Sequence, residues 1–225
     1  MDTEVVIIGG GPCGLMASLL LERQGVPNVL LEKHPHITAY PKAMGITRRT
    51  AEIYRQLGLL AERREAALPA EVDAVQIWLT SLVGEELGRS PAVEPADAPT
   101  PCTRFHCPQT HTESVLRAAV AAAPLSDIRF GARVTEVAET GEGVTATVVN
   151  RECGASNELR ARWLNAADGA ASRMRERFGI ATHGPGDRDH FLNVYFRADY
   201  GPHLAGRRSI LYSLLKENAT SSSSR

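Results

Sequence analysis

The stretch EVVIIGGGPCGLMASLLLERQGVPNVLLE, residues 4–32, decides the fold of this chain. Residues 4–8 are mostly apolar and β-branched, which is typical of a strand buried on both faces. A glycine-rich turn follows, and residues 15–24 then place apolar side chains at helical spacing before Gly25 ends the helix. Residues 28–32 form a second apolar run. The stretch therefore predicts a complete strand–helix–strand unit of an α/β protein.

Gly9, Gly11 and Gly14 have the spacing of a dinucleotide-binding turn. The first glycine lets the chain turn tightly, the second lets a pyrophosphate approach the backbone, and the third lets helix and strand pack closely. Glu32 ends the second strand about 20 residues later, where a carboxylate can accept hydrogen bonds from ribose hydroxyls. Because that carboxylate would repel a 2′-phosphate, the site favours FAD or NAD over NADP. The alternative is a glycine-rich turn that binds nothing.

Composition excludes several classes of protein. The chain has 225 residues, 25 Lys and Arg against 26 Asp and Glu, and a net charge of −1, so it carries no basic surface for nucleic acid or an anionic membrane. No apolar run approaches the roughly 20 residues that span a bilayer, and no cationic leader precedes residue 4. Four cysteines stand at positions 13, 102, 107 and 153, without the spacing of a metal site. We expect a cytoplasmic protein with free thiols, no metal, no nucleic-acid partner and no membrane partner.

Beyond residue 32 the periodicity predicts further helices and strands. Helices are expected over 47–65, 109–123 and 172–178, and strands over 72–79, 128–130, 133–139, 144–150, 159–167, 191–198 and 209–215. Thr110 or Thr112 is the expected N-cap of the second of these helices. The prolines of 91–101 predict a loop or an edge. The strands of 133–150 form a predicted β-meander, which interrupts the β–α alternation of a nicotinamide dehydrogenase.

A second motif, DGAASRMR at residues 168–175, follows the last strand of this region. Together with the glycine turn and the meander, it resembles the class A flavoprotein monooxygenases, the family of para-hydroxybenzoate hydroxylase and phenol hydroxylase. The resemblance covers residues 4 to about 214. In that family the segment Asp-Gly-x-x-Ser-x-Val-Arg contacts both FAD and the nicotinamide coenzyme, and Met174 takes the valine place here. The alternative is a strand-to-helix turn in which Asp168 caps the helix.

Two further matches extend the resemblance. The stretch PKAMGITRRT, residues 41–50, is similar to a loop that lies over the flavin in the family, with Lys42 in place of the usual arginine and Arg48 available to a phosphate or ribose. Gln109 falls where the family has a glutamine near the ribityl chain; a solvated arginine and a surface glutamine are the alternatives. The cofactor-binding residues implied are Gly9, Gly11, Pro12, Cys13, Gly14, Glu32, Lys33, Lys42, Arg48, Gln109, Asp168 and Gly169.

The resemblance implies an enzyme that binds FAD and uses NAD(P)H and O₂ to hydroxylate an aromatic substrate, phenolic or polyketide-like, through a flavin C4a-hydroperoxide. Met44 stands where the phenol hydroxylases have an aspartate, so no catalytic acid or base is assigned. The choice between NADH and NADPH stays open, as does a homodimer.

The implied fold is α/β, a FAD-binding Rossmann-like domain of the glutathione-reductase type with a β-meander, plus the start of a β-sheet substrate domain. We expect residues 1–180 to form the FAD-binding domain, with 72–101 contributed to the substrate domain, 181–215 to be a partial substrate domain and 216–225 a disordered tail. The family's third motif, Gly-Asp at a helix start, is matched only by Gly186-Asp187, which comes too early. We therefore expect a C-terminally truncated chain that holds FAD weakly and hydroxylates little or nothing. The alternative from another class is a non-catalytic nucleotide-binding remnant that acts through a partner.

Overall fold

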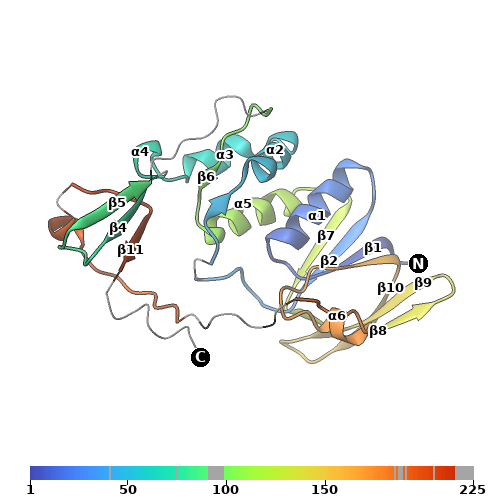
Figure 1. Cartoon of the computed structure of the whole chain (residues 1–225). Coiled ribbons are helices and arrows are strands. Elements are labelled where there is room, and N and C mark those ends of the chain that lie inside the picture. Colours follow the sequence, from blue (N-terminus) through green and yellow to red (C-terminus); the bar gives the residue numbers. More distant parts are fainter. Residues whose placement is uncertain are drawn as a thin grey trace. The chain divides into compact units, whose positions relative to one another are not determined.

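The computed structural model describes residues 1–40, 42–73, 75–90, 99–184, 186, 190, 192–204 and 206–215. The chain divides into two compact units (Figure 1). The first unit comprises Met1–Ala43 and Gln109–Phe191, and the second comprises Met44–Pro108 and Leu192–Arg225. Each unit is therefore made from segments that are distant in the sequence.

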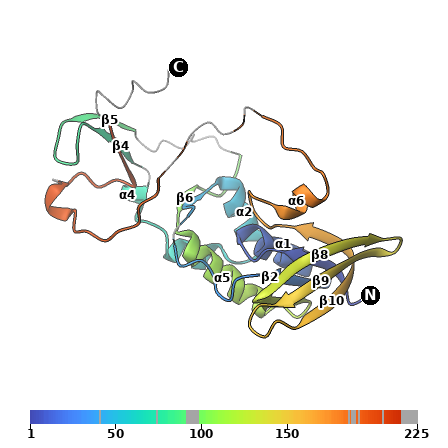
Figure 2. The same ribbon diagram turned by 90° about the horizontal axis from the view of Figure 1, so that it is seen from below.

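The first unit is built on a six-stranded sheet with the strand order β7-β2-β1-β10-β9-β8. Its strands are β1 (Thr3–Ile8), β2 (Asn28–Glu32), β7 (Ser126–Phe130), β8 (Ala132–Thr140), β9 (Gly143–Asn150) and β10 (Ser156–Ala166). Strands β7, β2, β1 and β10 run parallel, whereas β8, β9 and β10 form an antiparallel meander (Figure 2). The long strand β10 joins the two parts, because its residues 156–161 pair with β9 and its residues 161–166 pair with β1.

Helices α1 (Pro12–Arg23) and α5 (Gln109–Ala121) cover one face of the parallel strands (Figure 1). A core on the meander side joins parallel strands, meander and the short helix α6 (Arg173–Arg177) through the buried side chains of Val6, Ile8, Val29, Leu31, Ala132, Val137, Ala146, Val148, Leu159, Ala161 and Met174. The predicted α/β fold with a parallel sheet and a β-meander is thus confirmed. No helix in the described part of the chain is long and apolar enough to cross a bilayer.

The second unit contains two small sheets and three helices among its described residues. Its elements are β3 (Gly45–Ile46), α2 (Arg48–Gln56), α3 (Leu60–Glu65), α4 (Ala70–Asp73), β4 (Gln76–Leu79), β5 (Glu86–Ser90), β6 (Phe105–His106), a 3₁₀ turn (Gly201–His203) and β11 (Leu211–Leu214). Strands β3 and β6 pair with each other, and β4 lies between β11 and β5. Asp73 ties α4 to β6, since its Oδ1 accepts from the backbone N–H of His106 at 2.9 Å and lies 2.8 Å from the Nδ1 of that ring.

Several predicted elements of the second unit are wrong in their bounds. The helix expected over 47–65 is two helices, because Gly58 adopts a φ of +76° between them. The strand expected over 72–79 begins only at Gln76, since the residues before it form α4. Strands β3, β5 and β6 were not predicted, and the two-residue strands among them are too short to show a period.

Two other expectations are also corrected. Helix α5 begins at Gln109, so Thr110 and Thr112 lie inside the helix and neither is its N-cap. Residues 192–198 form no strand although their apolar residues alternate, because a strand also needs a neighbouring edge and no described strand pairs with them. Position 191, residues 91–98 of the proline-rich stretch, Asp187 and the tail 216–225 lie outside the described residues.

Candidate cofactor-binding site

The candidate site lies where β1, β2 and β10 end at the same edge of the sheet. The backbone N–H of Gly9 donates to Leu31 O at 2.9 Å, and that of Ala167 donates to Ile8 O at 2.8 Å, so the three carboxyl ends are level. Ligands of open α/β sheets bind at this edge.

Two glycines of the β1–α1 turn are required by the packing of the protein itself. Gly9 has a φ of +111°, and a Cβ on it would collide with the carbonyl oxygen of Ala167. A Cβ on Gly14 would collide with the carbonyl oxygen of Gly9, so the first turn of α1 can lie close to the strand end only with glycine at this position. These two residues account for the tight turn and the close helix packing that the motif predicts.

Gly11 is different, because nothing in the described part of the chain requires a glycine there. Its φ of −74° and ψ of −179° suit any residue, and a Cβ on it would have no atom within 4 Å. It is the N-cap of α1 and supplies no side-chain cap, and Pro12 follows it. Within the described residues, the N–H groups of Gly11, Cys13 and Gly14 have no hydrogen-bond acceptor. Open space in front of free amides at a helix N-terminus fits a diphosphate, the group that FAD would place there.

Glu32, at the end of β2, braces this turn. Its Oε2 accepts from the backbone N–H of Gly10 at 2.6 Å, and its Oε1 accepts from that of His34 at 2.7 Å. A Cβ on Gly10 would lie 2.7 Å from the Cβ of Glu32, so the close approach of the carboxylate also needs a glycine. The predicted contact of Glu32 with ribose hydroxyls stays a prediction. Its hold on the glycine turn was not predicted, because a bond to Gly10 depends on side-chain orientation rather than on spacing.

The remaining basic candidates are spread over the chain. Lys33 follows β2 and is exposed, and its carbonyl accepts from the Nη1 of Arg151 at 3.2 Å. Lys42 is exposed near the end of the loop after β2. Arg48 is the first residue of α2, which belongs to the second unit. Their contacts with a cofactor stay predictions.

Asp168 and Gly169 follow β10, and Asp168 is turned toward the protein. Its Oδ1 accepts from the hydroxyl of Ser172 at 2.5 Å, and its Oδ2 accepts from the backbone N–H of Met174 at 3.1 Å. Partial burial raises the pKa of Asp168, but the hydrogen bonds from Ser172 and Met174 outweigh burial and hold that pKa below its ordinary value. Asp168 therefore stabilises the start of α6 as an ionised carboxylate, and its contact with a cofactor stays a prediction.

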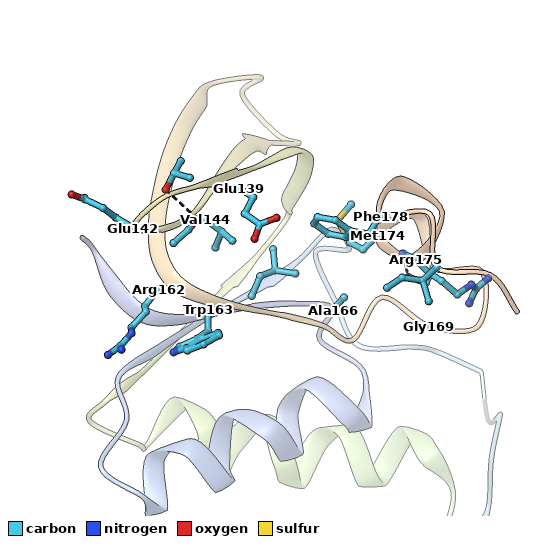
Figure 3. A pocket seen from close by; sticks show the side chains of 15 residues that line it. Glu139, Glu142, Val144, Arg162, Trp163, Ala166, Gly169, Met174, Arg175 and Phe178 are labelled. Carbon is cyan, nitrogen blue, oxygen red and sulfur yellow. Dashed lines mark hydrogen bonds between the residues drawn. The ribbon is translucent and has the colours of Figure 1, made fainter.

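A cavity of about 810 Å³ lies beside this second motif. Figure 3 shows Met174 of α6 and Phe178, the residue that follows α6, reaching it, together with Glu139 and Val144 of the β8–β9 hairpin. Trp163, from the second half of β10, also lines it and is 62% exposed. The sequence did not predict this cavity, because its walls come from three segments that are remote from one another in the chain.

Gln109 lies at the first position of α5 and bonds the loop that follows β2. Its Oε1 accepts from the backbone N–H of Ala43 at 3.2 Å, and its own backbone N–H donates to Ala43 O at 2.9 Å. Its Nε2 donates to Glu113 Oε1 at 2.7 Å. Sequence reasoning missed Glu113, although the spacing of four residues in a predicted helix placed it beside Gln109.

This geometry defines a nucleotide-binding α/β protein whose glycine turn, helix N-terminus and strand-end carboxylate suit a dinucleotide. The protein family described as "FAD binding domain" matches residues 2–223. The chain therefore belongs to this family, whose cofactor is FAD, and the nicotinamide dehydrogenase alternative is set aside.

Similar proteins of known name are monooxygenases. The tetracenomycin B2 monooxygenase-dioxygenase of Streptomyces olivaceus is 33% identical over 94% of this chain and 42% of its own length. The 2,4-dichlorophenol 6-monooxygenase of Delftia acidovorans is 30% identical over 98% of this chain and 39% of its own length. The solved structure of the flavin-dependent monooxygenase PieE in complex with FAD and substrate superposes with a TM-score of 0.77 at 33% identity, over 82% of this chain and 33% of that one. The chain thus spans about two fifths of the length of the curated relatives it matches.

Proposed function

We propose that this chain binds FAD and serves the hydroxylation of an aromatic substrate, phenolic or polyketide-like, with NAD(P)H and O₂ as co-substrates. The observation that carries the proposal is the open space beside Gly11. No atom of the described residues fills this space, and it lies in front of the free amides of α1. The names of the relatives support the reaction, since they include an oxygenase of tetracenomycin B2 and one of 2,4-dichlorophenol. When bound, FAD supplies the redox chemistry, because no amino-acid side chain can activate O₂ with electrons from a nicotinamide.

The chain's own residues bind and orient the cofactor in this proposal. The amides of Gly11, Cys13 and Gly14 hold the pyrophosphate, with the positive end of the α1 dipole behind them. Glu32 holds the glycine turn through Gly10 and accepts from the adenosine ribose. The other proposed contacts are Gly9 and Pro12 at the turn, Lys33, Lys42 and Arg48 toward phosphate or ribose, Gln109 toward the ribityl chain, and Asp168 and Gly169 at the second motif.

The proposed division of the chain assigns residues 1–180 to FAD binding and 181–215 to a partial substrate domain that also takes residues 72–101. The sheet β11-β4-β5 supports this assignment, because β11 at Leu211–Leu214 pairs in parallel with β4 at Gln76–Leu79. Gln76 Nε2 also donates to the hydroxyl of Ser213 at 3.1 Å. A cytoplasmic location and a homodimer stay predictions.

The purified 225-residue chain tests the proposal directly. Its visible absorption spectrum is recorded before and after FAD is added and after gel filtration, and oxidation of NADH and of NADPH is then followed with a panel of phenols and polyketide-like aromatics. A flavin spectrum that co-elutes with the protein is the expected result. We expect little or no substrate-dependent NAD(P)H oxidation from this length of chain. Binding of NAD without any binding of FAD would contradict the proposed function.

A second candidate function is that of a non-catalytic FAD-binding protein that acts through a partner. Exposed apolar side chains after residue 191 favour this second candidate. Leu192 is 90% exposed, and Val194 and Phe196 are also exposed. Light scattering on the flavin-loaded chain tests the case in which the partner is a second copy of this chain. A monomer speaks against self-association through this surface.

A further inference from the structure

The loop between β2 and the second unit is fastened to α5 at two points. In its middle, the backbone N–H of Thr38 donates to Glu113 Oε2 at 3.1 Å. At its end, Ala43 exchanges two hydrogen bonds with Gln109, from Ala43 N–H to Gln109 Oε1 and from Gln109 N–H to Ala43 O. The loop between these points carries Lys42, a proposed cofactor contact.

Glu113 connects the two points. It is buried, with 4% of its surface exposed, and lies one helical turn after Gln109. Its Oε1 accepts from Gln109 Nε2 at 2.7 Å while its Oε2 accepts from Thr38. One buried carboxylate therefore holds both the middle of the loop and the side chain that holds its end.

The chemistry of these groups fixes which way the Gln109 amide faces. Glu113 Oε1 accepts from Gln109 Nε2, so the NH₂ group of Gln109 is turned toward Glu113. The carbonyl Oε1 then faces the N–H of Ala43, which needs an acceptor. A flipped amide would set oxygen against oxygen at Glu113 and N–H against N–H at Ala43. In the observed orientation, Glu113 takes one hydrogen of Nε2 and leaves the second for another acceptor.

We propose that Glu113 is a positioning residue for flavin binding: it sets the Gln109 amide so that its second N–H can donate to a ribityl hydroxyl, and it latches the loop that carries Lys42. This inference rests on the proposed function for its ligand. The latch itself depends only on the hydrogen bonds among Glu113, Gln109, Thr38 and Ala43.

Exchanging the side chains of Gln109 and Glu113 tests the hold on the loop separately from the N–H that Gln109 offers to a ligand. In Glu113→Gln, the new amide can accept from only one of its two donors, so the latch is weakened. In the double variant Gln109→Glu with Glu113→Gln, all three side-chain hydrogen bonds can form again, because position 109 now accepts from both Ala43 and the amide at position 113, whose oxygen accepts from Thr38. The double variant has no side-chain N–H at position 109 to offer a ligand. Glu136→Gln, at an exposed position of β8, is the matched control for loss of a carboxylate.

Two readouts are taken on the full 225-residue chain. The first, without FAD, is the rate at which trypsin cuts the Lys42–Ala43 bond relative to the Arg208–Ser209 bond in the same digest, followed by mass spectrometry. The second is the Kd for FAD from flavin fluorescence. For Glu113→Gln we expect about tenfold faster relative cutting at Lys42 and about tenfold weaker FAD binding, the effect of one lost buried hydrogen bond. For the double variant we expect wild-type cutting at Lys42 with FAD binding still weakened, and for Glu136→Gln no change in either.

The outcomes keep the two proposals apart. If the wild-type chain binds no FAD, the proposed function fails, while the digests still report whether the latch exists. The positioning role is overturned if the wild-type chain binds FAD and Glu113→Gln matches it in both readouts, the rate of cutting at the Lys42–Ala43 bond and the Kd for FAD. It is also overturned if the double variant does not regain protection of the Lys42–Ala43 bond, whether or not Glu113→Gln folds.

Discussion

Two strand-to-helix turns lie at the carboxyl edge of the sheet, and they use the first amides of their helices in opposite ways. At the β1–α1 turn, Gly11 offers no side-chain cap, and the leading amides of α1 have no acceptor in the described part of the chain. At the β10–α6 turn, the Ser172 hydroxyl accepts from Arg175 N–H at 3.0 Å and Asp168 accepts from Met174 N–H. The first helix start is open to an anion, whereas the second is closed by the protein's own oxygens.

Each turn also has a glycine and a nearby carboxylate, but the two carboxylates bond different groups. Glu32 holds the backbone of the glycine turn from outside it, through Gly10, and leaves the helix start clear. Asp168 bonds the helix start itself. A carboxylate that bonds elsewhere leaves the first amides of a helix open to a phosphate, whereas a carboxylate that bonds those amides closes the helix start. Changes at the first turn should therefore act most strongly on FAD binding, and changes at the second should act on stability in addition to the proposed contacts of Asp168 and Gly169 with the cofactor.

The largest difference between the two turns is expected in the free energy of unfolding when Gly14 and Gly169 are each replaced by alanine. Gly14→Ala places a Cβ against the carbonyl oxygen of Gly9 and should lower the free energy of unfolding by about 3 kcal/mol. Gly169 has a φ of +95° but open space around it, so Gly169→Ala should cost about 1–2 kcal/mol from backbone strain alone. Urea unfolding of both variants measures the difference. Equal losses would show that the first turn is not packed as closely as described.

The next prediction concerns Glu32, whose carboxylate holds the backbone of the first turn. Glu32→Gln keeps the shape of the side chain but can accept from only one of the two N–H groups, of Gly10 and His34. We expect a loss of about 2 kcal/mol in stability and about tenfold in FAD affinity, measured by urea unfolding and by flavin fluorescence. Glu4→Gln, at an exposed position of β1, is the control and should change neither. Unchanged FAD binding in Glu32→Gln would remove Glu32 from the site.

At the second turn, Asp168→Asn should act on stability and depend on pH. The folded-state pKa of Asp168 is lowered, so its contribution is present above the unfolded pKa of about 3.9 and is lost as pH falls through the folded value. We expect the wild type to exceed Asp168→Asn by about 1 kcal/mol at pH 7, and this difference to shrink steadily as pH falls below about 4. Thermal unfolding from about pH 2 to 7 measures the difference. A difference that does not shrink at all below about pH 4 would contradict the role of the ionised carboxylate.

The smallest effect is a chemical footprint of the open turn. Cys13 and Cys153 are both exposed and free, and only Cys13 lies at the start of α1. FAD at ten times its Kd should slow alkylation of Cys13 about tenfold and leave Cys153 unchanged. Peptide mass spectrometry after iodoacetamide labelling follows both thiols in one sample. Equal protection of the two cysteines would place the ligand elsewhere.

The first unit could be predicted from the sequence and much of the second could not, for physical reasons. Residues 4–32 form long buried elements whose period and glycine spacing mark each boundary. The break at Gly58 and the late start of β4 depend on local backbone angles and on contacts such as that of Asp73 with His106. Apolar residues alternate over 192–198 as in a strand, but this pattern does not show whether a neighbouring strand is available for pairing.

Within the candidate site, spacing predicted the glycines and Glu32 but not which atoms they hold. The opposite behaviour of Gly11 and Gly14 follows from what surrounds each Cβ position, which only three-dimensional packing reveals. The link from Glu113 to Gln109 was open to prediction, since four residues apart on one helix are neighbours. Its contact with Thr38 was not, because that depends on the path of an irregular loop.

We infer that Gly11 is a glycine because of a ligand and not because of the fold. Titration of FAD into the wild-type chain and into Gly11→Val, followed by flavin fluorescence, tests it most directly, with urea unfolding of both proteins alongside. We predict that Gly11→Val unfolds within about 1 kcal/mol of wild type, because its side chain enters open space, and that it binds FAD at least about a hundredfold more weakly. Equal FAD affinities in two equally stable proteins would show that the glycine at position 11 does not serve FAD binding.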